Sequence, residues 1–552
     1  MNPSAAPGLR CVLPAALCIL ALVCPAWAQQ DQPPAQALPS LAQLEAAGAT
    51  IGEITVRVRN IFDTDDPNED KLAFRWANAL HIQTRVGVIE RALLFQRGEP
   101  LSVRLIDETE RVLRMARYLY DVQIRAVAYR DGIVDLEVQT RDTWTLDPGL
   151  SAGRTGGANT SGISLKEFNL LGSGIALSYG RSNSVDRSSN EFQISNSRAF
   201  GGWTSLSYSR AHNSDGQREA ATVAHPFYAL DTPWAAGVTV SKDNRIDSIY
   251  NAGKIASQYR HRQDQAEVFG GWSRGRIDGW VRRYSIGLTH SDDRFALEPG
   301  HTPPARLPPD EKLVAPFLRY EVIEDRFEKL QNRNQIGRPE FFALGWASTF
   351  QLGQATTALG SSSDAWLYSG SLSRGFEPAA QHIMLASLSM AGQYSGGGAR
   401  RQRVAGQAQY FLPQSPDWLF YAAATGDMLT RPDPADSLLL GGDNGLRGYP
   451  LRYQSGTRRA LLTLEERAYT DVYVWRLFRL GGAAYVDAGR AWGGDNMNTV
   501  NPGWLSNVGI GLRIFSDRAA FSHVLHIDLA FPLEIDANEK KLQFLIKTRT
   551  SF

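Results

Sequence analysis

The residues best suited to charge chemistry in this sequence are one arginine in a glycine-rich stretch and two acids that follow it. The stretch Gly441–Tyr449 contains four glycines and presents Arg447. Glycines give a compact backbone that packs closely against a wall, so this stretch can fold back into the interior of a barrel. Asp487, in the stretch Gly482–Gly489, can then hold the guanidinium by charge-assisted hydrogen bonds. The chemistry expected here is the tethering of a loop.

The strands around these residues must place the acids on one face. In Ala460–Arg467 the period of two puts Thr463, Glu465 and Arg467 on the face opposite Leu462 and Leu464. On the next strand Asp487 shares a face with Tyr485, so Glu465 and Asp487 are both expected in the lumen. Loss of one partner from such a buried network costs about 3–5 kcal/mol. The alternative is that Arg447 lies in a solvated external turn and Asp487 is an ordinary polar residue of the lumen.

Signals of catalysis are absent from the sequence. It has no G-x-S-x-G, no P-loop and no H-E-x-x-H pattern, and its nine histidines are scattered. No Lys-Ser/Thr and no helix pattern follow Gly441–Gly448, so this stretch is not expected to cradle a phosphate. The three cysteines, Cys11, Cys18 and Cys24, lie in a segment that export removes, which leaves no thiol for a metal site or a disulfide. We expect no enzyme, no cofactor and no metal.

Residues 1–28 have the pattern of a secretory signal peptide. Arg10 precedes an apolar run over Val12–Val23, and Ala26-Trp27-Ala28 has the small-residue pattern of a cleavage site. Since Arg10 is the only charged side chain of this segment, its removal takes the formal net charge from +1 to zero. A neutral chain gives no support for nucleic acid as a partner. Residues 29–50 are rich in proline and are expected to be a linker, with at most a short helix at Leu41–Ala47.

Residues 51–145 have the pattern of a small α+β domain with the order strand, helix, helix, strand, strand. The expected elements are strands over Ile54–Val58, Val122–Ala128 and Val134–Val138 and helices over Val86–Phe95 and Val103–Leu119. Ser102 is a candidate N-cap for the second helix. The pattern assigns no element to the insertion Thr64–Leu80.

Residues 146–552 form a series of short alternating segments, which is typical of a transmembrane antiparallel β-barrel. Apolar and polar side chains alternate clearly along Val508–Ile514, Leu525–Phe531 and Leu542–Phe552. Beyond Ala28 the sequence has no run of 18 apolar residues, so no membrane-spanning helix is expected. A soluble sandwich also alternates but turns its apolar face inward. The signal peptide and the lack of cysteines beyond it favour the membrane class.

The length of this region sets the number of strands. Roughly 400 residues can hold 16 to 20 spanning strands of about ten residues each. The Pro-rich stretch Leu297–Pro309 is expected to be a loop. Further candidate strands are Gly174–Gly180, Trp203–Ser209, Trp234–Ser241, Tyr284–His290, Phe341–Gln351 and Ile383–Gln393.

The C-terminal motifs resemble those of the BamA/TamA superfamily of outer-membrane proteins, in which periplasmic POTRA domains precede a barrel. The superfamily's [V/L]-R-G-[F/Y] loop is matched by Leu446, Arg447, Gly448 and Tyr449. Its acid-bearing strand is matched by Tyr485-Val486-Asp487-Ala488-Gly489, and the acidic strand before it by Glu465-Glu466-Arg467.

Two other segments add to the resemblance. The segment Leu113–Val122 is similar to part of a POTRA domain. A small periplasmic α+β domain of another kind is the alternative. The terminal Phe552 matches the C-terminal signal by which outer-membrane barrels are recognised for assembly. The resemblance favours 16 strands over 20. It also implies a Gram-negative outer-membrane location, with residues 51–145 in the periplasm.

The function that the resemblance implies is assembly, insertion or translocation of other proteins. A client strand would add at a weak seam between the first strand, Leu146–Arg154, and the last, with the loop inside the barrel. The implied partners are the lipid bilayer, unfolded or exported client polypeptides and accessory assembly proteins. A second class, two-partner-secretion translocators, exports a polypeptide through the lumen and typically has two POTRA domains. A third class, passive porins and surface antigens, lacks the small domain and the tethered loop.

Overall fold

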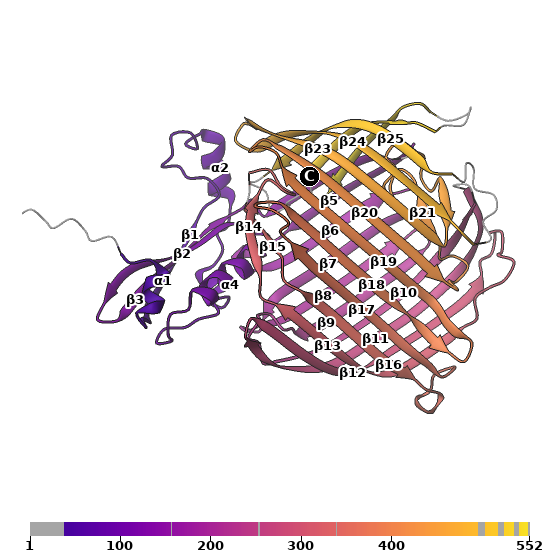
Figure 1. Cartoon of the computed structure of the whole chain (residues 1–552), viewed down its shortest axis with the longest axis horizontal. Helices are drawn as coiled ribbons and strands as arrows, with labels where there is room; N and C mark the ends of the chain where they lie inside the picture. Colours follow the sequence, from indigo (N-terminus) through magenta and orange to yellow (C-terminus); the bar gives the residue numbers. More distant parts are fainter. Residues whose placement is uncertain are drawn as a thin grey trace, which may run out of the picture.

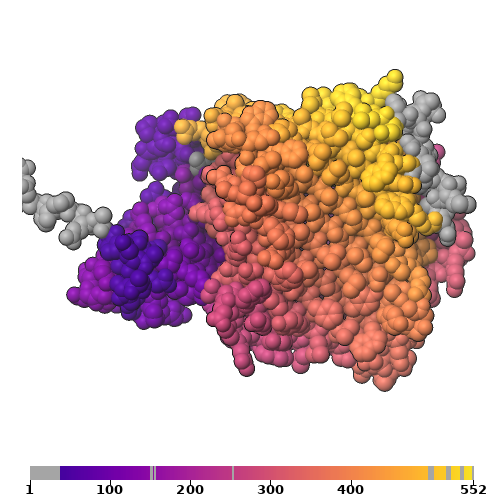
Figure 2. Space-filling view, viewed as in Figure 1, coloured from indigo at the N-terminus to yellow at the C-terminus, as the bar shows by residue number. Residues whose placement is uncertain are grey.

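The computed structural model describes residues 38–155, 157–251, 254–337, 339–494, 503–516, 524–534 and 540–549. A small N-terminal domain (residues 38–145) lies at one end of a wide barrel (Figure 1). Figure 2 shows this domain as a separate, smaller lobe. We name the barrel end that carries the lobe the domain end and the opposite end the far end. The predicted signal peptide, 1–28, and the terminal Phe552 lie outside the described residues.

The N-terminal domain is a three-stranded sheet with helices against it. The sheet order is β1-β3-β2, with β3 parallel to β1 and antiparallel to β2. Ser102 caps α4, as its position in the sequence predicts, because its hydroxyl accepts from the backbone N–H of Leu105. The elements are α1 (Leu41–Ala46), β1 (Thr50–Arg59), α2 (Leu72–Leu80), α3 (Val86–Glu90), α4 (Val103–Arg114), β2 (Leu119–Arg130) and β3 (Ile133–Asp142).

One apolar core holds this domain together. Alternate residues of β3, among them Val134, Leu136 and Val138, are fully buried against α3 and α4. Burying side chains of this size stabilises the domain by about 1.5–3 kcal/mol each. Leu44 of α1 belongs to the same core, so this helix packs on the domain although it falls in the predicted linker.

The observed order β1, α3, α4, β2, β3 is the one that the sequence pattern predicts, with both helices shorter than expected. α3 ends at Glu90 and α4 at Arg114. The insertion Thr64–Leu80, which the pattern leaves without an element, contains α2. Among the helices of the described residues, none is long and apolar enough to cross a bilayer.

Twenty antiparallel strands of the described residues close into the barrel. Short 3-10 turns lie at Leu170–Gly172 and Thr357–Leu359. The barrel strands are β4 (Leu146–Thr155), β5 (Ala158–Glu167), β6 (Ile175–Asn183), β7 (Ser188–Ala199), β8 (Thr204–Asn213), β9 (Gly216–His225), β10 (Trp234–Asn251), β11 (Lys254–Ile277), β12 (Trp280–Leu297), β13 (Glu311–Glu324), β16 (Ala347–Ala355), β17 (Ala365–Phe376), β18 (Ile383–Ser395), β19 (Gly398–Pro413), β20 (Trp418–Thr430), β23 (Arg458–Val474), β24 (Phe478–Trp492), β25 (Leu505–Ser516), β26 (Val524–Pro532) and β27 (Gln543–Arg549).

The preference for 16 strands is therefore wrong, and the upper bound of 20 is the observed number. A period of two identifies a strand but does not say whether the strand joins the wall or forms a hairpin in a loop. The candidate Phe341–Gln351 shows the same ambiguity. Its first residues belong to β15 (Pro339–Ala343), outside the barrel sheet, and its later ones to β16.

The barrel turns its apolar side chains outward, as predicted for a membrane. Val508, Ile510 and Leu512 of β25 are exposed, whereas Asn507 and Arg513 face inward and are fully buried. At the domain end, outward-facing tryptophans mark the edge of the apolar belt, as expected at a membrane interface. They are Trp234, Trp272, Trp418 and Trp475.

The N-terminal domain is bonded directly to turns at the domain end. Thr84 Oγ1 accepts from Asn169 Nδ2 at 2.8 Å in the turn between β5 and β6. Glu108 of α4 accepts from the backbone N–H of Leu230 at 2.7 Å in the turn between β9 and β10. These buried bonds orient α4 at the mouth of the barrel.

Candidate functional site

The segment between β20 and β23 (residues 431–457), which we name the internal loop, folds back into the barrel from the far end. Its base is a short hairpin of β21 (Leu438–Leu440) and β22 (Gln454–Gly456). Gly445 has φ +115°, and a Cβ atom there would meet Leu461 at 2.1 Å. A Cβ on Gly448 would meet the Asn507 side chain at 2.7 Å. The turn therefore requires glycine at both positions to approach the wall.

Arg447 is buried in the lumen, with 2% of its surface exposed. Its Nε and Nη2 donate to the two oxygens of Asp487 at 2.8 and 2.9 Å, and its Nη1 donates to Glu465 at 3.0 Å. The guanidinium also lies 3.2 Å from the ring centre of Tyr485. A bidentate pair, a second carboxylate and an aromatic face are among the strongest non-covalent partners of a guanidinium.

The wall presents Asp487 in a prepared environment. Thr463 on β23 and Asn507 on β25 are its register partners, and their side chains donate to it, each at 2.9 Å. With the two bonds from Arg447, the carboxylate has donors for about all four of its lone-pair sites. Although burial alone lowers the pKa of Arg447, Asp487 and Glu465 raise it well above its ordinary value. The loop arginine therefore stays charged.

Glu465 links this ion pair to further charges on the wall. Glu465 Oε1 accepts from Arg467 Nε at 3.0 Å. Glu465 Oε2, which binds Arg447, also lies 3.7 Å from Arg513 Nη2. Arg513 in turn donates to Asp528 at 2.7 Å. The result is a buried network of three arginines and three acids in which each charge has an opposite partner.

The other residues of the loop motif also contact the wall. Leu446 is fully buried in a cluster with Leu440 and Leu505. The backbone N–H of Gly448 donates to Asn507 at 3.1 Å. The Tyr449 hydroxyl lies 3.0 Å from both the Ser506 carbonyl oxygen and a Glu534 carboxylate oxygen, and these two acceptors share its one proton. Burial and the bond to Glu534 raise the pKa of Tyr449, so it stays a donor.

The internal loop also spans the seam between the last strand and the first. Lys547 of β27 donates to the Asp443 carbonyl at 3.3 Å. Beyond the seam, Arg452 pairs with Asp186 in the turn between β6 and β7 and lies 4.0 Å from the Tyr250 ring centre. The loop is thus held on both sides of the point where the barrel closes.

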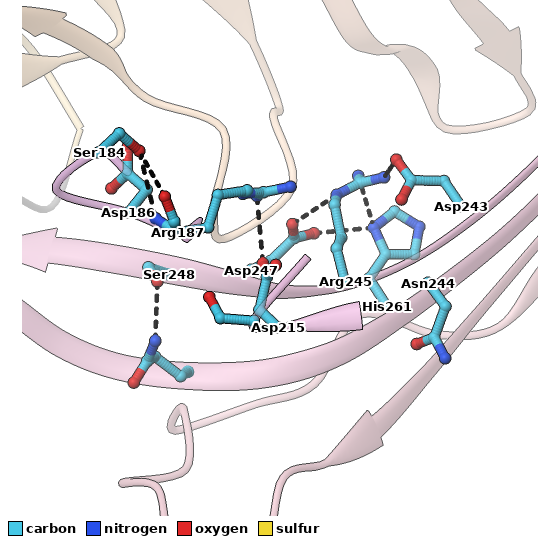
Figure 3. Close-up of polar contacts among 12 residues, drawn as sticks. Ser184, Asp186, Arg187, Asp215, Asp243, Asn244, Arg245, Asp247, Ser248 and His261 are labelled. Carbon is cyan, nitrogen blue, oxygen red and sulfur yellow. Dashed lines mark hydrogen bonds and ion pairs between the residues drawn. The ribbon is translucent and has the colours of Figure 1, made fainter. Parts of the chain in front are cut away.

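The wall of the lumen opposite β24 carries a separate charged cluster on β10 and β11 (Figure 3). β10 lies half a circuit from β24 in the order of the barrel strands. Arg245 pairs with Asp243 at 3.0 Å and with Asp247 at 2.7 Å, and His261 lies 2.7 Å from Asp247. These groups show that the inward face is polar on both walls.

A second insertion, which the sequence pattern did not reveal, fills the domain end of the barrel. Residues 325–346 lie between β13 and β16 and contain the hairpin of β14 (Phe327–Gln331) and β15. We name this segment the mouth hairpin. Its Ile336, Phe342 and Leu344 pack on inward-facing wall residues. These wall residues are Ile383, Phe411, Leu419, Tyr421, Tyr469, Ala483, Phe515 and Val524.

The mouth hairpin touches the charged network at one side and the N-terminal domain at the other. The carbonyl of Arg333 accepts from Arg467 Nη1 at 2.8 Å and from the Tyr469 hydroxyl at 3.1 Å. At the other side, the Arg111 guanidinium of α4 lies 4.0 Å from the Phe327 ring centre. The N-terminal domain, mouth hairpin, wall network and internal loop are thus in continuous contact. The only sequence signal for the hairpin is short alternation, which also fits a wall strand.

Comparison with known proteins finds similarity in fold. No family model and no curated protein matches the sequence. Matching solved structures include BamA from Haemophilus ducreyi lacking POTRA domains 1–3 (13% identity, TM-score 0.39, covering 90% of this chain and 84% of that one). They also include CdiB from Acinetobacter baumannii (14%, 0.43, 90% and 74%) and CdiB from Escherichia coli (13%, 0.45, 90% and 76%).

Replacing Arg447 by alanine is expected to lower the free energy of unfolding by about 3–5 kcal/mol, because Asp487 and Glu465 stay buried without their common partner. Arg447→Lys is expected to be intermediate, since one ammonium cannot reproduce the bidentate bond. The measurement is urea unfolding in lipid vesicles, followed by tryptophan fluorescence. Arg458→Ala, on an exposed arginine of β23, is the control and is expected to change stability by under about 0.5 kcal/mol. An equal loss of stability in the two alanine variants would contradict a stabilising role for the Arg447 ion pairs.

Replacing residues 328–342 by a short Gly-Ser linker is expected to raise the single-channel conductance in planar bilayers. The reason is that the mouth hairpin occupies the lumen at the domain end. The control is the same linker in place of residues 300–308, in the loop between β12 and β13. Equal conductance of the two variants would show that the hairpin does not obstruct the pore.

Proposed function

We propose that this protein is an outer-membrane assembly, insertion or translocation factor for client polypeptides. In this proposal a client strand adds at the seam between β27 and β4 while the internal loop braces the barrel. The observation that carries the proposal is the buried pairing of Arg447 with Asp487 and Glu465. Burying these charges costs desolvation free energy, and a passive pore has no need of a loop that is tied to its wall in this way.

The pairing of the seam supports strand addition. Among the described residues, β27 and β4 align at Ile546 and Arg154 only, whereas β4 and β5 align along the whole of β4. β4 also contains Pro148, which has no N–H to donate to a ladder. A poorly paired edge is a template for another strand. A client can use it through backbone hydrogen bonds, without a particular side-chain sequence.

The N-terminal domain is proposed to be a POTRA domain on the periplasmic side. Its order of strands and helices, with β1 and β2 at the two edges of the sheet, supports this assignment. An edge strand of such a sheet can bind an extended client segment near the mouth. Since this mode relies on backbone groups, we assign no site residue in this domain. We propose no catalytic role for the protein.

Export of a polypeptide through the lumen is the second candidate. The mouth hairpin favours it, because a threaded chain needs a removable closure at the periplasmic end. Accessory proteins are compatible with either candidate. A passive porin or surface antigen is less well supported, since the lumen holds both the mouth hairpin and the internal loop.

A disulfide across the seam distinguishes these candidates. Arg154→Cys with Ile546→Cys joins an aligned pair of β4 and β27, and the chain beyond residue 28 has no other cysteine. In proteoliposomes the oxidised protein is expected to lose insertion of a barrel client and to regain it on reduction. Ala530→Cys with Gln543→Cys, aligned on β26 and β27, is the matched control and is expected to stay active when oxidised.

Unchanged insertion by the oxidised seam variant would rule out strand addition at this seam. Export of a polypeptide into the vesicle lumen by that same oxidised variant would favour the translocator.

A further inference from the structure

Helix α2 exposes its apolar side. Leu72, Trp76 and Leu80 have 75%, 62% and 68% of their surface exposed. Because they are spaced by four residues, the three side chains lie along one face of the helix. Ala73 and Ala79 are also exposed, and Arg75 is the one charged residue inside the helix. A helix on a soluble domain normally turns such a face to the core.

The opposite side of α2 is fixed to the domain. Phe74 is buried and stacks on Phe62 with ring centres 4.1 Å apart. Asn78 accepts from the backbone N–H of Phe62 at 3.0 Å and donates to its carbonyl at 2.8 Å. Rotation of the helix to bury Trp76 would break these bonds. The exposed apolar face is therefore built into the fold.

The helix is attached to the rim of the barrel. Its buried cluster includes Trp144, just before β4, and Leu477, in the turn between β23 and β24. Asp66, in the segment that leads to α2, lies 4.0 Å from Arg476 of the same turn. Figure 1 shows α2 beside the domain end of the barrel on the side of β23.

At this rim the outer surface of the barrel is also apolar. Trp475, two residues from Leu477, is 74% exposed, and Val472 and Phe478 on the adjoining strands are exposed as well. Tryptophan at the end of a barrel strand marks the level of the lipid headgroups. Trp76 thus lies on a helix anchored at the level where the barrel meets the headgroups.

We propose that α2 is an interfacial anchor that lies in the phospholipid leaflet at the domain end. Leu72, Trp76 and Leu80 enter the boundary between headgroups and acyl chains, whereas the Arg75 guanidinium is paired with Asp70. A short helix with one large apolar face can take this position by burial of apolar area alone. Charge attraction is not required, since the segment that precedes the helix is acidic (Asp63, Asp65, Asp66, Glu69 and Asp70). The apolar rim next to it, continuous with the lipid-facing wall, makes lipid the occupant. The inference needs only a bilayer around the barrel and is independent of the proposed function.

The absence of cysteines beyond residue 24 permits single-site labelling of the mature chain. Trp76→Cys carries an environment-sensitive fluorophore in proteoliposomes of phosphatidylethanolamine and phosphatidylglycerol that contain shallow nitroxide-labelled lipid. The expected result is a blue-shifted emission with ~threefold stronger quenching than for the control label. The control is Arg97→Cys, at an exposed position of the same domain near the start of β1, away from the barrel.

A second label at Leu80→Cys guards against a local effect of replacing the tryptophan and is expected to show the same quenching. The proposal is overturned if both labels on α2 are quenched no more than the label at position 97 while the barrel is folded. That result would also be found if a protein partner, and not lipid, covered the helix.

Discussion

The structure depends on one buried guanidinium. Arg447 is held in the lumen by Asp487 and Glu465, and a charge in this position is stable only while its partners stay in place. The wall supplies those partners from neighbouring strands, so the register of β23, β24 and β25 must be kept. The glycines of the turn are required because the loop backbone must come close enough for the arginine to reach them.

The same constraint places the loop where a brace is needed. From its tethered arginine the internal loop extends to Lys547 on one side of the seam and to Asp186 on the other. The loop contacts thus lie at the closure of the barrel, where the described residues of β27 and β4 align at one pair only. A barrel whose seam is weak can remain closed in this way without a complete hydrogen-bond ladder.

Much of this site follows from the sequence, because side chains alternate between the two faces of a strand and the residue spacing thus determines which of them share a face. That rule placed Glu465 and Asp487 together in the lumen, and a glycine-rich turn beside them predicted a tethered arginine. The rule contains no information on how a strand is paired. It therefore did not separate the mouth hairpin from the wall. The preferred number of 16 strands came from the resemblance, and it is lower than the 20 strands of the barrel. The rule also missed α2, whose apolar face lies outside any core.

The two insertions differ in how their contacts can be replaced. The mouth hairpin is held mainly by apolar side chains such as Ile336 and Phe342, each worth about 1.5–3 kcal/mol, together with hydrogen bonds to a backbone carbonyl. Any extended apolar segment that enters the mouth can supply similar contacts. The internal loop is held by a bidentate guanidinium, which an arbitrary segment cannot reproduce. The hairpin is accordingly the exchangeable element and the loop the fixed one. Arg467 contacts both the hairpin carbonyl and Glu465. Displacement of the hairpin therefore removes one hydrogen-bond acceptor from an arginine of the network that holds the loop.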